Sequence, residues 1–376
     1  MSTFTGWWRT VGVIVGLELR QRTRATRWRV LLGIFFLVVS AVVFGSLWFA
    51  LSSTSRTSWA YNGWSENLYF IVLGFVGFLG LVIAPTMTAT AINGDRKDAT
   101  LAVVQATPAS GFQIAMGKLL GAWIASCALL LVSTPYLIWA IVEAHYPVAF
   151  SLLGIAVIAL VLLAYCGLGL GMSALFSRPI GSAAVTQLAV LFLLIGLPVI
   201  TAMLAPATVG TQQAVQTRFT YNNADGSGRC TEVREDVEVT HTERIWWVMA
   251  ANPAVVFADA AAQSDPGREA RGHGRRYADY TSSAPAPDES ALGALADLVS
   301  DVRVGADRNH DETCVEKYGE AYSVSVDGYG DDTREVGRTW YWGLLVNLAL
   351  GGIGLAFAAR RLRVPAANLP RGVRIA

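Results

Sequence analysis

The stretch AFSLLGIAVIALVLLAYCGLGLGMSALF, residues 149–176, carries no charged side chain. A helix needs about 20 apolar residues to cross the hydrocarbon core of a bilayer, and this stretch exceeds that length. Helices buried in a large soluble core are mostly shorter and are rarely this free of charge. The stretch is therefore predicted to be a transmembrane helix, and the chain around it to be a membrane protein.

Five more apolar runs of spanning length occur in the sequence. Hydrophobic residues make up 53% of the 376-residue chain, which is high for a soluble protein of this length. The runs cover residues 30–51, 69–92, 115–142, 182–205 and 340–359. We therefore expect an all-α polytopic membrane protein with six transmembrane helices.

A further apolar segment, RIWWVMAANPAVVFADAAAQ (244–263), is almost long enough to cross the membrane. Asn252-Pro253 breaks it in the middle, and Asp259 places a charge inside it. Counting it as a span would also put the basic C-terminal tail on the opposite side from the other basic segments. We expect instead an interfacial helix, anchored by its tryptophan pair, that rests on the outer leaflet.

Basic residues mark one side of the predicted bundle. Arginine and lysine are frequent in residues 1–29, in the loop before the third run and in the tail after residue 359. The short loops around residues 52–68 and 143–148, by contrast, contain only Arg56. Because short basic loops stay in the cytoplasm, we expect a multi-pass protein of the cell membrane with both termini cytoplasmic.

Residues 206–339 form a stretch that is too long to be a simple connector. Acidic side chains outnumber basic ones in it, whereas the rest of the chain is basic. The segment TEVREDVEVT (231–240) alternates as a strand does, and DESALGALADLVSDV (288–302) has helical spacing. The predicted domains are thus residues 1–205, with an amphipathic N-terminal helix and five spans, an extracytoplasmic mixed α/β insertion at 206–339, and residues 340–376, with the last span and a basic tail.

Two of the four cysteines, Cys230 and Cys314, fall in this insertion. An extracytoplasmic position exposes them to an oxidising compartment. A disulfide between them would be worth about 4 to 5 kcal/mol in the chain-entropy model. We expect this bridge, with two free surface thiols as the alternative. No metal site is expected, because no cysteine or histidine spacing typical of metal ligands accompanies the pair.

No signature of an enzyme occurs in the sequence. The chain lacks the phosphate-binding G-x-x-x-x-G-K-[ST] loop, the H-E-x-x-H zinc motif and the G-x-S-x-G nucleophile elbow. The six runs also lack the ionisable residue that an ion-coupled transporter keeps near the bilayer midplane. The chain is therefore expected not to be an enzyme and to bind no cofactor, so any transport would draw its energy from another protein.

Polar and small residues inside the runs have structural explanations. The polar ones are expected to hydrogen-bond between helices, with substrate contact as the alternative. They are Ser126, Ser133, Thr134, Gln187 and Asn347. The glycines of GFVGFLG (74–80) and GLGLG (167–171) are expected to let neighbouring helices approach closely.

The segment NGDRKDATLAVVQATPASGFQIAMGK (93–118) joins the second and third runs. The four charges at its start would cost about 10 kcal/mol in hydrocarbon, so the segment must protrude into the cytoplasm. Leu101 and Val104 form an apolar stripe on a predicted short helix, which the Thr-Pro pair at Pro108 ends. Ser110 is a candidate N-cap of the next helix.

This segment resembles the first cytoplasmic loop of ABC-2 type exporter permeases, which runs from an acidic cluster through Thr-Leu and Thr-Pro-x-Ser to Gly-Lys. The matching landmarks are Asp98, Thr100, Leu101, Thr107, Pro108, Ser110, Gly117 and Lys118. Ala99 stands where the family usually has glycine, and the leading acid is Asp rather than Glu. The basic amphipathic stretch 6–29 is similar to the family's interfacial elbow helix, and residues 252–260 are similar to a segment before its last span.

The resemblance implies a half-transporter that exports an amphipathic or lipid-like substrate. It would pair in the lipid membrane with a second permease, identical or not, and with two separate ABC ATPase subunits that carry ATP and Mg²⁺; no nucleic acid is implied as a partner. The protruding loop would be the coupling helix that docks on the ATPase. The residues implied in docking are Asp95, Asp98, Thr100, Leu101, Val104, Thr107, Pro108 and Lys118.

Two other functions stay open. One is a membrane receptor or sensor whose acidic extracytoplasmic lobe binds a ligand or a partner protein, although the short cytoplasmic parts contain no catalytic or coiled-coil module. The other is a membrane-embedded hydrolase, for which no nucleophile and base pair can be named. In both cases residues 93–118 would be a solvated loop that merely joins two helices.

Overall fold

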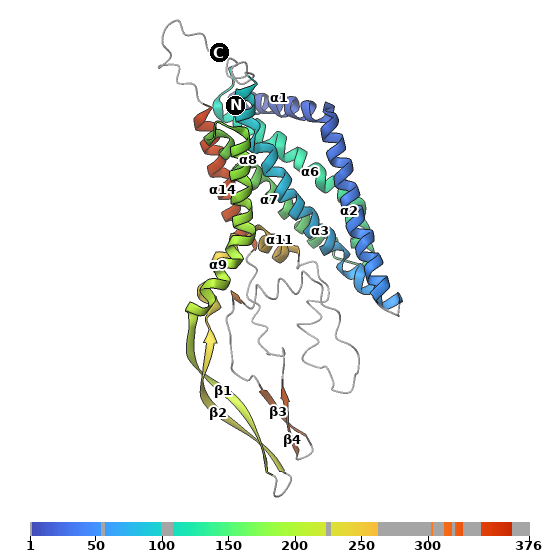
Figure 1. The fold of residues 1–376 in the computed structure, drawn as a ribbon, viewed down its shortest axis with the longest axis vertical. Helices are drawn as coiled ribbons and strands as arrows, with labels where there is room; N and C mark the ends of the chain where they lie inside the picture. Colours follow the sequence, from blue (N-terminus) through green and yellow to red (C-terminus); the bar gives the residue numbers. More distant parts are fainter. Residues whose placement is uncertain are drawn as a thin grey trace.

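A computed structural model describes residues 2–53, 57–98, 108–222, 227–261, 302–303, 312–317, 320–325 and 340–362. Six helical segments in this part of the chain are long and apolar enough to cross a membrane (Figure 1). They are Thr26–Ser52, Ala60–Lys97, Gly111–Glu143, Val148–Leu175, Pro179–Thr208 and Trp340–Arg361. Each overlaps one of the six apolar runs of the sequence, so the prediction of a helical, six-span membrane protein is confirmed.

The first two helices form a corner at Ala25. Helix α1 (Ser2–Arg24) lies across one end of the bundle, and α2 (Thr26–Ser53) runs along its side (Figure 1). The side of α1 that faces the bundle repeats every three or four residues, as an amphipathic helix requires. It carries Trp7, Val11, Ile14, Glu18 and Arg22. The expected N-terminal elbow helix is therefore present.

Helix α7 (Val148–Leu175) is the centre of the bundle. Helices α3 (Thr57–Ala89), α6 (Gly111–Glu143) and α14 (Trp340–Arg361) pack around it. The hydroxyl of Tyr69 in α3 donates a hydrogen bond of 2.7 Å to the backbone carbonyl at the start of α7. Four residues of α7 are each 1% exposed: Val157, Ile158, Val161 and Leu162. One side of the charge-free stretch 149–176 therefore lies in the core of the bundle.

Glycines bring α7 and α14 into backbone contact. A Cβ added to Gly167 would lie 2.5 Å from the carbonyl oxygen of Gly351, and one added to Gly171 would lie 2.6 Å from the Cα of Gly354. No larger residue fits at these positions without separating the two helices. The close approach expected for the glycine-rich stretch of α7 is confirmed. In α3, a Cβ on Gly77 would lie 3.3 Å from Ile158 and one on Gly80 would lie 2.9 Å from Leu162, both in α7, whereas one on Gly74 would meet nothing within 4 Å.

The fifth span is irregular. It consists of α8 (Pro179–Leu191), a π-helical turn (Phe192–Gly196), α9 (Leu197–Leu204) and a 3₁₀ turn (Ala205–Thr208). Pro198 has no N–H to donate to the carbonyl of Leu194 one turn earlier, which explains the local change of helix type. The side chain of Asn252 donates a hydrogen bond of 2.9 Å to that carbonyl. Only 11% of the most apolar stretch of this span is buried.

Two short helices, α10 (Trp246–Ala250) and α11 (Pro253–Ala261), occupy the apolar segment that the sequence excluded as a span. Neither crosses the membrane, and Trp247 of α10 is 65% exposed, as an interfacial helix requires. Helix α11, however, is buried against α3, α7 and α14, so the expectation of a helix resting on the leaflet is wrong for this half. Glycines make the space for it: a Cβ on Gly343 would lie 2.5 Å from Val256.

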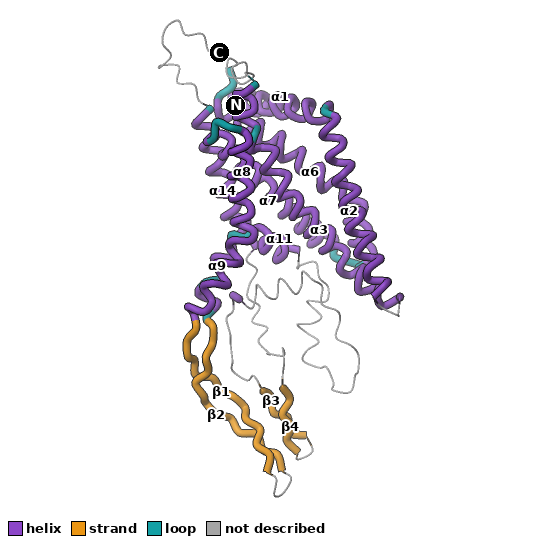
Figure 2. Tube along the Cα trace, viewed as in Figure 1, coloured by secondary structure: helices purple, strands orange, loops and turns teal. Residues whose placement is uncertain are grey.

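Strands occur only between the fifth and sixth spans in the described part of the chain (Figure 2). β1 (Val209–Asn222) pairs antiparallel with β2 (Ser227–Thr240), and β3 (Glu312–Lys317) with β4 (Glu320–Ser325). The strand expected at 231–240 is confirmed, and the described part of the insertion contains both strands and short helices. The helix expected at 288–302 lies outside the described residues, apart from its last residue. We call the bundle end at which these strands lie the strand end.

The disulfide expected in the insertion stays a prediction. The backbones of Cys230 and Cys314 lie in β2 and β3, but their side chains lie outside the described residues. Among the described side chains, Cys127 and Cys166, which lie inside spans, are free.

Candidate functional site

The docking residues that the resemblance implies lie on both sides of residues 99–107, which are outside the described part of the chain. Asp95 lies in α4 (Ala91–Lys97), and Asp98 follows as its exposed C-cap. Pro108 is exposed just before α6, and Lys118 lies two turns into that helix. Thr100, Leu101, Val104 and Thr107 lie outside the described residues. The structure thus fixes the two ends of the loop, which we call its roots.

The first root is a break in the second span between α3 and α4. The Oγ of Ser173 in α7 accepts hydrogen bonds of 2.9 Å and 3.2 Å from the backbone N–H groups of Ile92 and Asn93. The Oγ of Ser182 in α8 donates a bond of 2.6 Å to the carbonyl of Ala89. Backbone groups freed by the break are therefore satisfied by two other helices, which fix the direction of α4.

The second root is the start of α6. Ser110 and Gln113 form a capping box: the Ser110 side chain accepts from the Gln113 N–H at 3.2 Å, and the Gln113 side chain accepts from the Ser110 N–H at 2.7 Å. The N-cap expected at Ser110 is thus confirmed. Gln113 also donates to the backbone carbonyl of Trp7, and the ring of Trp7 lies 5.9 Å from that of Phe112. The first turn of α6 is therefore attached to α1.

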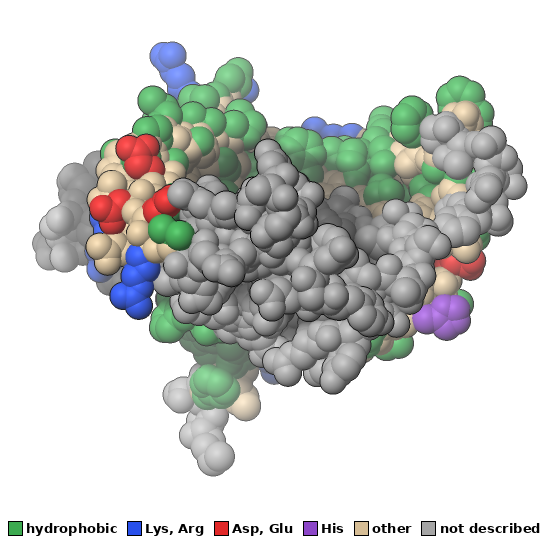
Figure 3. All heavy atoms as spheres, turned by 90° about the horizontal axis from the view of Figure 1, so that it is seen from below, with side chains coloured by type: hydrophobic (Ala, Val, Ile, Leu, Met, Phe, Trp, Pro, Cys, Tyr) green, Lys and Arg blue, Asp and Glu red, His purple; other side chains and the backbone are tan. Residues whose placement is uncertain are grey.

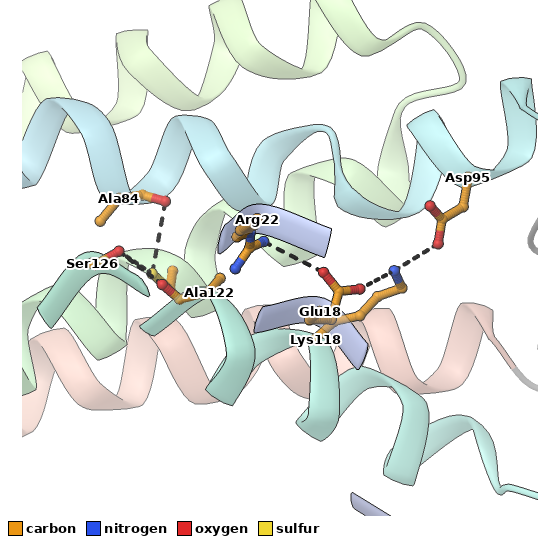
Figure 4. Close-up of polar contacts among 8 residues, drawn as sticks. Glu18, Arg22, Ala84, Asp95, Lys118, Ala122 and Ser126 are labelled. Atoms are coloured by element: carbon orange, nitrogen blue, oxygen red, sulfur yellow. Dashed lines mark hydrogen bonds and ion pairs between the residues drawn. The ribbon is translucent and has the colours of Figure 1, made fainter. Parts of the chain in front are cut away.

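Four charged side chains join the roots to α1 (Figure 4). Lys118 contacts Glu18 at 2.8 Å and Asp95 at 2.6 Å, and Glu18 also contacts Arg22 at 3.6 Å. We call this alternating row of charges the ion chain. Two cations and two anions balance, so the cluster is neutral although the side chains of Lys118 and Glu18 are only 7% and 14% exposed. Removing any member would leave a shielded charge without its counterion.

Glycines of α6 make room for the ion chain. A Cβ on Gly117 would lie 2.5 Å from Ile14, and one on Gly121 would lie 2.8 Å from the Cβ of Glu18. Helix α1 therefore crosses α6 at the two glycines that flank Lys118, and this crossing places Glu18 beside the ammonium group. The Gly-Lys landmark of the resemblance thus lies at the contact between α1 and α6.

Sequence reasoning named Asp95 and Lys118 but missed Glu18 and Arg22. Lys118 points into the bundle, toward α1 and α4 (Figure 4). The signal for Glu18 was available, because it is the only acidic residue before Glu66 in a segment rich in arginine. Its partner could not be read from the sequence, since one hundred positions separate the two residues.

Polar groups inside the spans mostly hold helices together. Gln187 of α8 donates to the carbonyl of Val82 in α3 at 2.7 Å, and Asn347 of α14 donates to the carbonyl of Ala251 at 3.1 Å. The interhelical role expected for these two amides is confirmed. Ser133 and Thr134 instead donate to carbonyls of their own helix, at 3.1 Å and 3.2 Å. Ser126 does the same at 3.0 Å and also lies 3.7 Å from the Cys166 sulfur of α7.

A second polar cluster lies at the strand end. The Asp259 carboxylate of α11 accepts a hydrogen bond of 2.8 Å from the backbone N–H of Trp340 and so caps α14. The guanidinium of Arg303 lies 5.5 Å from the ring of Trp246. Burial lowers the pKa of Arg303, and the Asp259 carboxylate opposes that shift. Insertion and last span are therefore in electrostatic contact.

The surface of the strand end is charged over its described hairpin. Seen from that end, acidic and basic side chains gather where β1 and β2 lie, and hydrophobic ones along the helices (Figure 3). Exposed charges on β2 include Arg234, Asp236 and Glu238. No group of three side chains able to hold a metal ion occurs among the described residues.

Comparison with known proteins adds no identity: no family and no curated protein matches this chain. The function must therefore be argued from the roots of the loop, the ion chain and the six spans.

Proposed function

We propose that the chain is the permease subunit of an ATP-driven exporter of the ABC-2 type. In this proposal it pairs with a second permease and with two ATPase subunits, which hydrolyse ATP with Mg²⁺ and dock at residues 93–118. The observation that supports it best is the attachment of both loop roots. Ser173 holds one root to α7, and the ion chain holds the other to α1.

Such attachment suits a loop that transmits force. A displacement applied at residues 98–108 would reach α7 and α8 through the hydrogen bonds of α4, and would reach α1 through Lys118. Packed helices move as rigid bodies rather than deforming continuously, so the helices joined by these contacts would shift together. A loop that only joins two helices needs no such anchoring.

The cargo in this proposal is amphipathic or lipid-like. The apolar sides of α2 and of the fifth span are largely unburied, at 17% and 11% burial of their most apolar stretches, and so are open to lipid. The buried polar groups near the centre are hydroxyls and amides, including Ser133 and Asn347. These features favour a cargo that shares the membrane environment over a small ion.

The substitution Leu101→Asp tests the proposal. A charge in the apolar stripe should release a docked ATPase, because losing a seated leucine forfeits about 2 kcal/mol and stranding a carboxylate adds at least as much. The affinity of the permease for the ATPase should fall roughly several-hundred-fold. The measurement is retention of a co-expressed ABC ATPase by the detergent-solubilised permease, and the permease alone should hydrolyse no ATP.

Arg56→Asp is the control for that experiment, because it introduces the same side chain into a short loop at the opposite end of the first span. It should leave retention of the ATPase unchanged. If the two variants retain the ATPase equally, residues 93–118 are not the docking site.

A receptor or sensor is the second candidate, and the strand-end cluster favours it. Arg303 of the insertion approaches α10 and α11, and Asp259 of α11 caps the last span, so a ligand on the insertion would act on that span. The two proposals differ in one measurement. A sensor would not retain an ATPase after co-expression.

A further inference from the structure

The corner between α1 and α2 concentrates positive charge. Five arginines lie within ten positions: Arg20, Arg22, Arg24, Arg27 and Arg29. Glu18 is the one acidic residue before Glu66, and its carboxylate is shared by Arg22 and Lys118 in the ion chain. Glu18, the acidic residue nearest to these arginines in the sequence, is therefore already paired inside the bundle.

Arg22 differs from its four neighbours. Its side chain turns toward the bundle, where it is 18% exposed, whereas Arg20, Arg24, Arg27 and Arg29 are exposed. None of these four makes an ion pair with an acidic residue in the described part of the chain. These four arginines thus lie at the corner between α1 and α2 without an acidic partner among the described residues, and we call them the arginine corner.

The depth of the arginine corner follows from α2. Arg27 and Arg29 lie in the first turn of this span, and its outward side begins one residue later with exposed apolar groups. These include Val30, Ile34, Leu37, Phe44 and Trp48. Since α2 is covered by lipid on that side, its first turn lies at the level of the phospholipid headgroups. The neighbouring residues Arg20 and Arg24 end α1 at the same corner (Figure 1).

We propose that the arginine corner binds the headgroups of anionic phospholipids. A guanidinium donates two parallel hydrogen bonds to a phosphate, and a basic cluster at the membrane end of a span attracts an anionic leaflet. A zwitterionic headgroup offers the same phosphate but adds a cation that four arginines repel. The lipid would hold α1 against α6 from outside, while the ion chain holds it from inside. The proposal is independent of any ATPase.

Native mass spectrometry of the purified full chain in nonionic detergent tests this. Phosphatidylglycerol and phosphatidylcholine are titrated separately, and the first phosphatidylglycerol should bind about tenfold more tightly or better, since each arginine near an anionic surface contributes about fivefold before screening. The variant Arg20→Gln/Arg24→Gln/Arg27→Gln/Arg29→Gln should lose this preference and keep its affinity for phosphatidylcholine. Inorganic phosphate, which has no acyl chain, should displace the lipid no better than chloride at equal ionic strength.

The chain offers a matched control with the same loss of charge. Arg96, Arg178, Arg360 and Arg361 are exposed on other helices at the same end of the bundle. Replacing these four by glutamine should leave the preference for phosphatidylglycerol within about twofold of the wild type. If the fourfold corner variant does not accumulate, Arg27→Gln/Arg29→Gln replaces it, and this variant should lose part of the preference for phosphatidylglycerol.

Three outcomes would overturn the proposal. Wild-type protein that binds both lipids equally has no site for an anionic headgroup. Equal losses in the two fourfold variants would mean attraction by overall charge rather than by the corner. Displacement by inorganic phosphate would indicate a site for a free anion.

Discussion

Lys118 shows how one residue can be buried in a membrane protein and still carry its charge. Desolvating an ammonium group costs several kcal/mol, and here two carboxylates within 3 Å offset that cost. Arg22 in turn contacts the other oxygen of the Glu18 carboxylate at 3.6 Å. The ion chain therefore holds three segments of the sequence, α1, α4 and α6, without leaving a net charge at their junction.

Replacing Lys118 by methionine should destabilise the protein strongly. The side chain keeps its approximate length, but the carboxylates of Glu18 and Asp95 are left shielded and opposed, which costs about 3 kcal/mol. We expect a thermal midpoint lower by several degrees, measured by size-exclusion chromatography of heated, detergent-solubilised protein. Lys97→Met, at an exposed position two residues after Asp95, is the control.

The control variant should melt with the wild type. Equal midpoints for Lys118→Met and Lys97→Met would show that the ion chain adds nothing to stability. The burial of Lys118 would then have no structural role, and the docking role that the resemblance implied for it would be the remaining explanation.

At the scale of elements, the spans were predictable and their irregularities were not. Length and absence of charge suffice for a helix such as α7, because the bilayer allows few other ways to satisfy its backbone. The break at Thr90 has no sequence signature, since the groups that stabilise it, Ser173 and Ser182, come from other helices. The burial of α11 depends likewise on cavities that glycines of three other helices leave.

The candidate site divides in the same way. Local signals such as the capping box at Ser110 follow from residues three positions apart and were predictable. The ion chain joins Glu18 to Lys118 across the tertiary fold, and no periodicity reports such a contact.

Contact between α7 and α14 can be tested with two adjacent glycines. A Cβ on Gly351 would lie 2.4 Å from the carbonyl oxygen of Ala164, whereas one on Gly352 would meet nothing within 4 Å. Both substitutions by alanine gain about 1 kcal/mol of helix propensity, so their difference isolates the clash. Backbone atoms cannot rotate away, and Gly351→Ala should therefore destabilise the folded protein by about 1 to 3 kcal/mol.

Gly352→Ala should be neutral or slightly stabilising. The measurement is the fraction of monodisperse protein that survives a heating series in detergent. Equal survival of the two variants would mean that α7 and α14 separate at little cost and do not form a rigid pair.

Basic residues are distributed unevenly along the long axis of the molecule. The end that carries α1 also carries four exposed arginines of other segments: Arg27 of α2, Arg96 of α4, Arg361 of α14 and Arg178, the N-cap of α8. The strand end carries the charged hairpin, and the short loops beside it contain Arg56 as their one basic residue. Because lysine and arginine in short loops are retained in the cytoplasm, this asymmetry predicts which end faces inward.

Cysteines introduced one at a time at the two ends test that orientation. Ser177 is exposed in the turn between α7 and α8 at the basic end, and Gln213 is exposed in β1 at the strand end. In a background with Cys230→Ser and Cys314→Ser, a membrane-impermeant maleimide applied to intact cells should label Gln213→Cys and leave Ser177→Cys unlabelled until the cells are permeabilised. The physical reason is that moving several arginines across hydrocarbon costs about 2.5 kcal/mol or more for each, whereas the sparsely basic strand end crosses readily. Labelling of Ser177→Cys in intact cells would show that the molecule has the opposite orientation. Residues 93–118 would then lie outside the compartment that contains ATP. The docking proposal and the predicted disulfide would then fail together, because each depends on which face of the membrane its residues occupy.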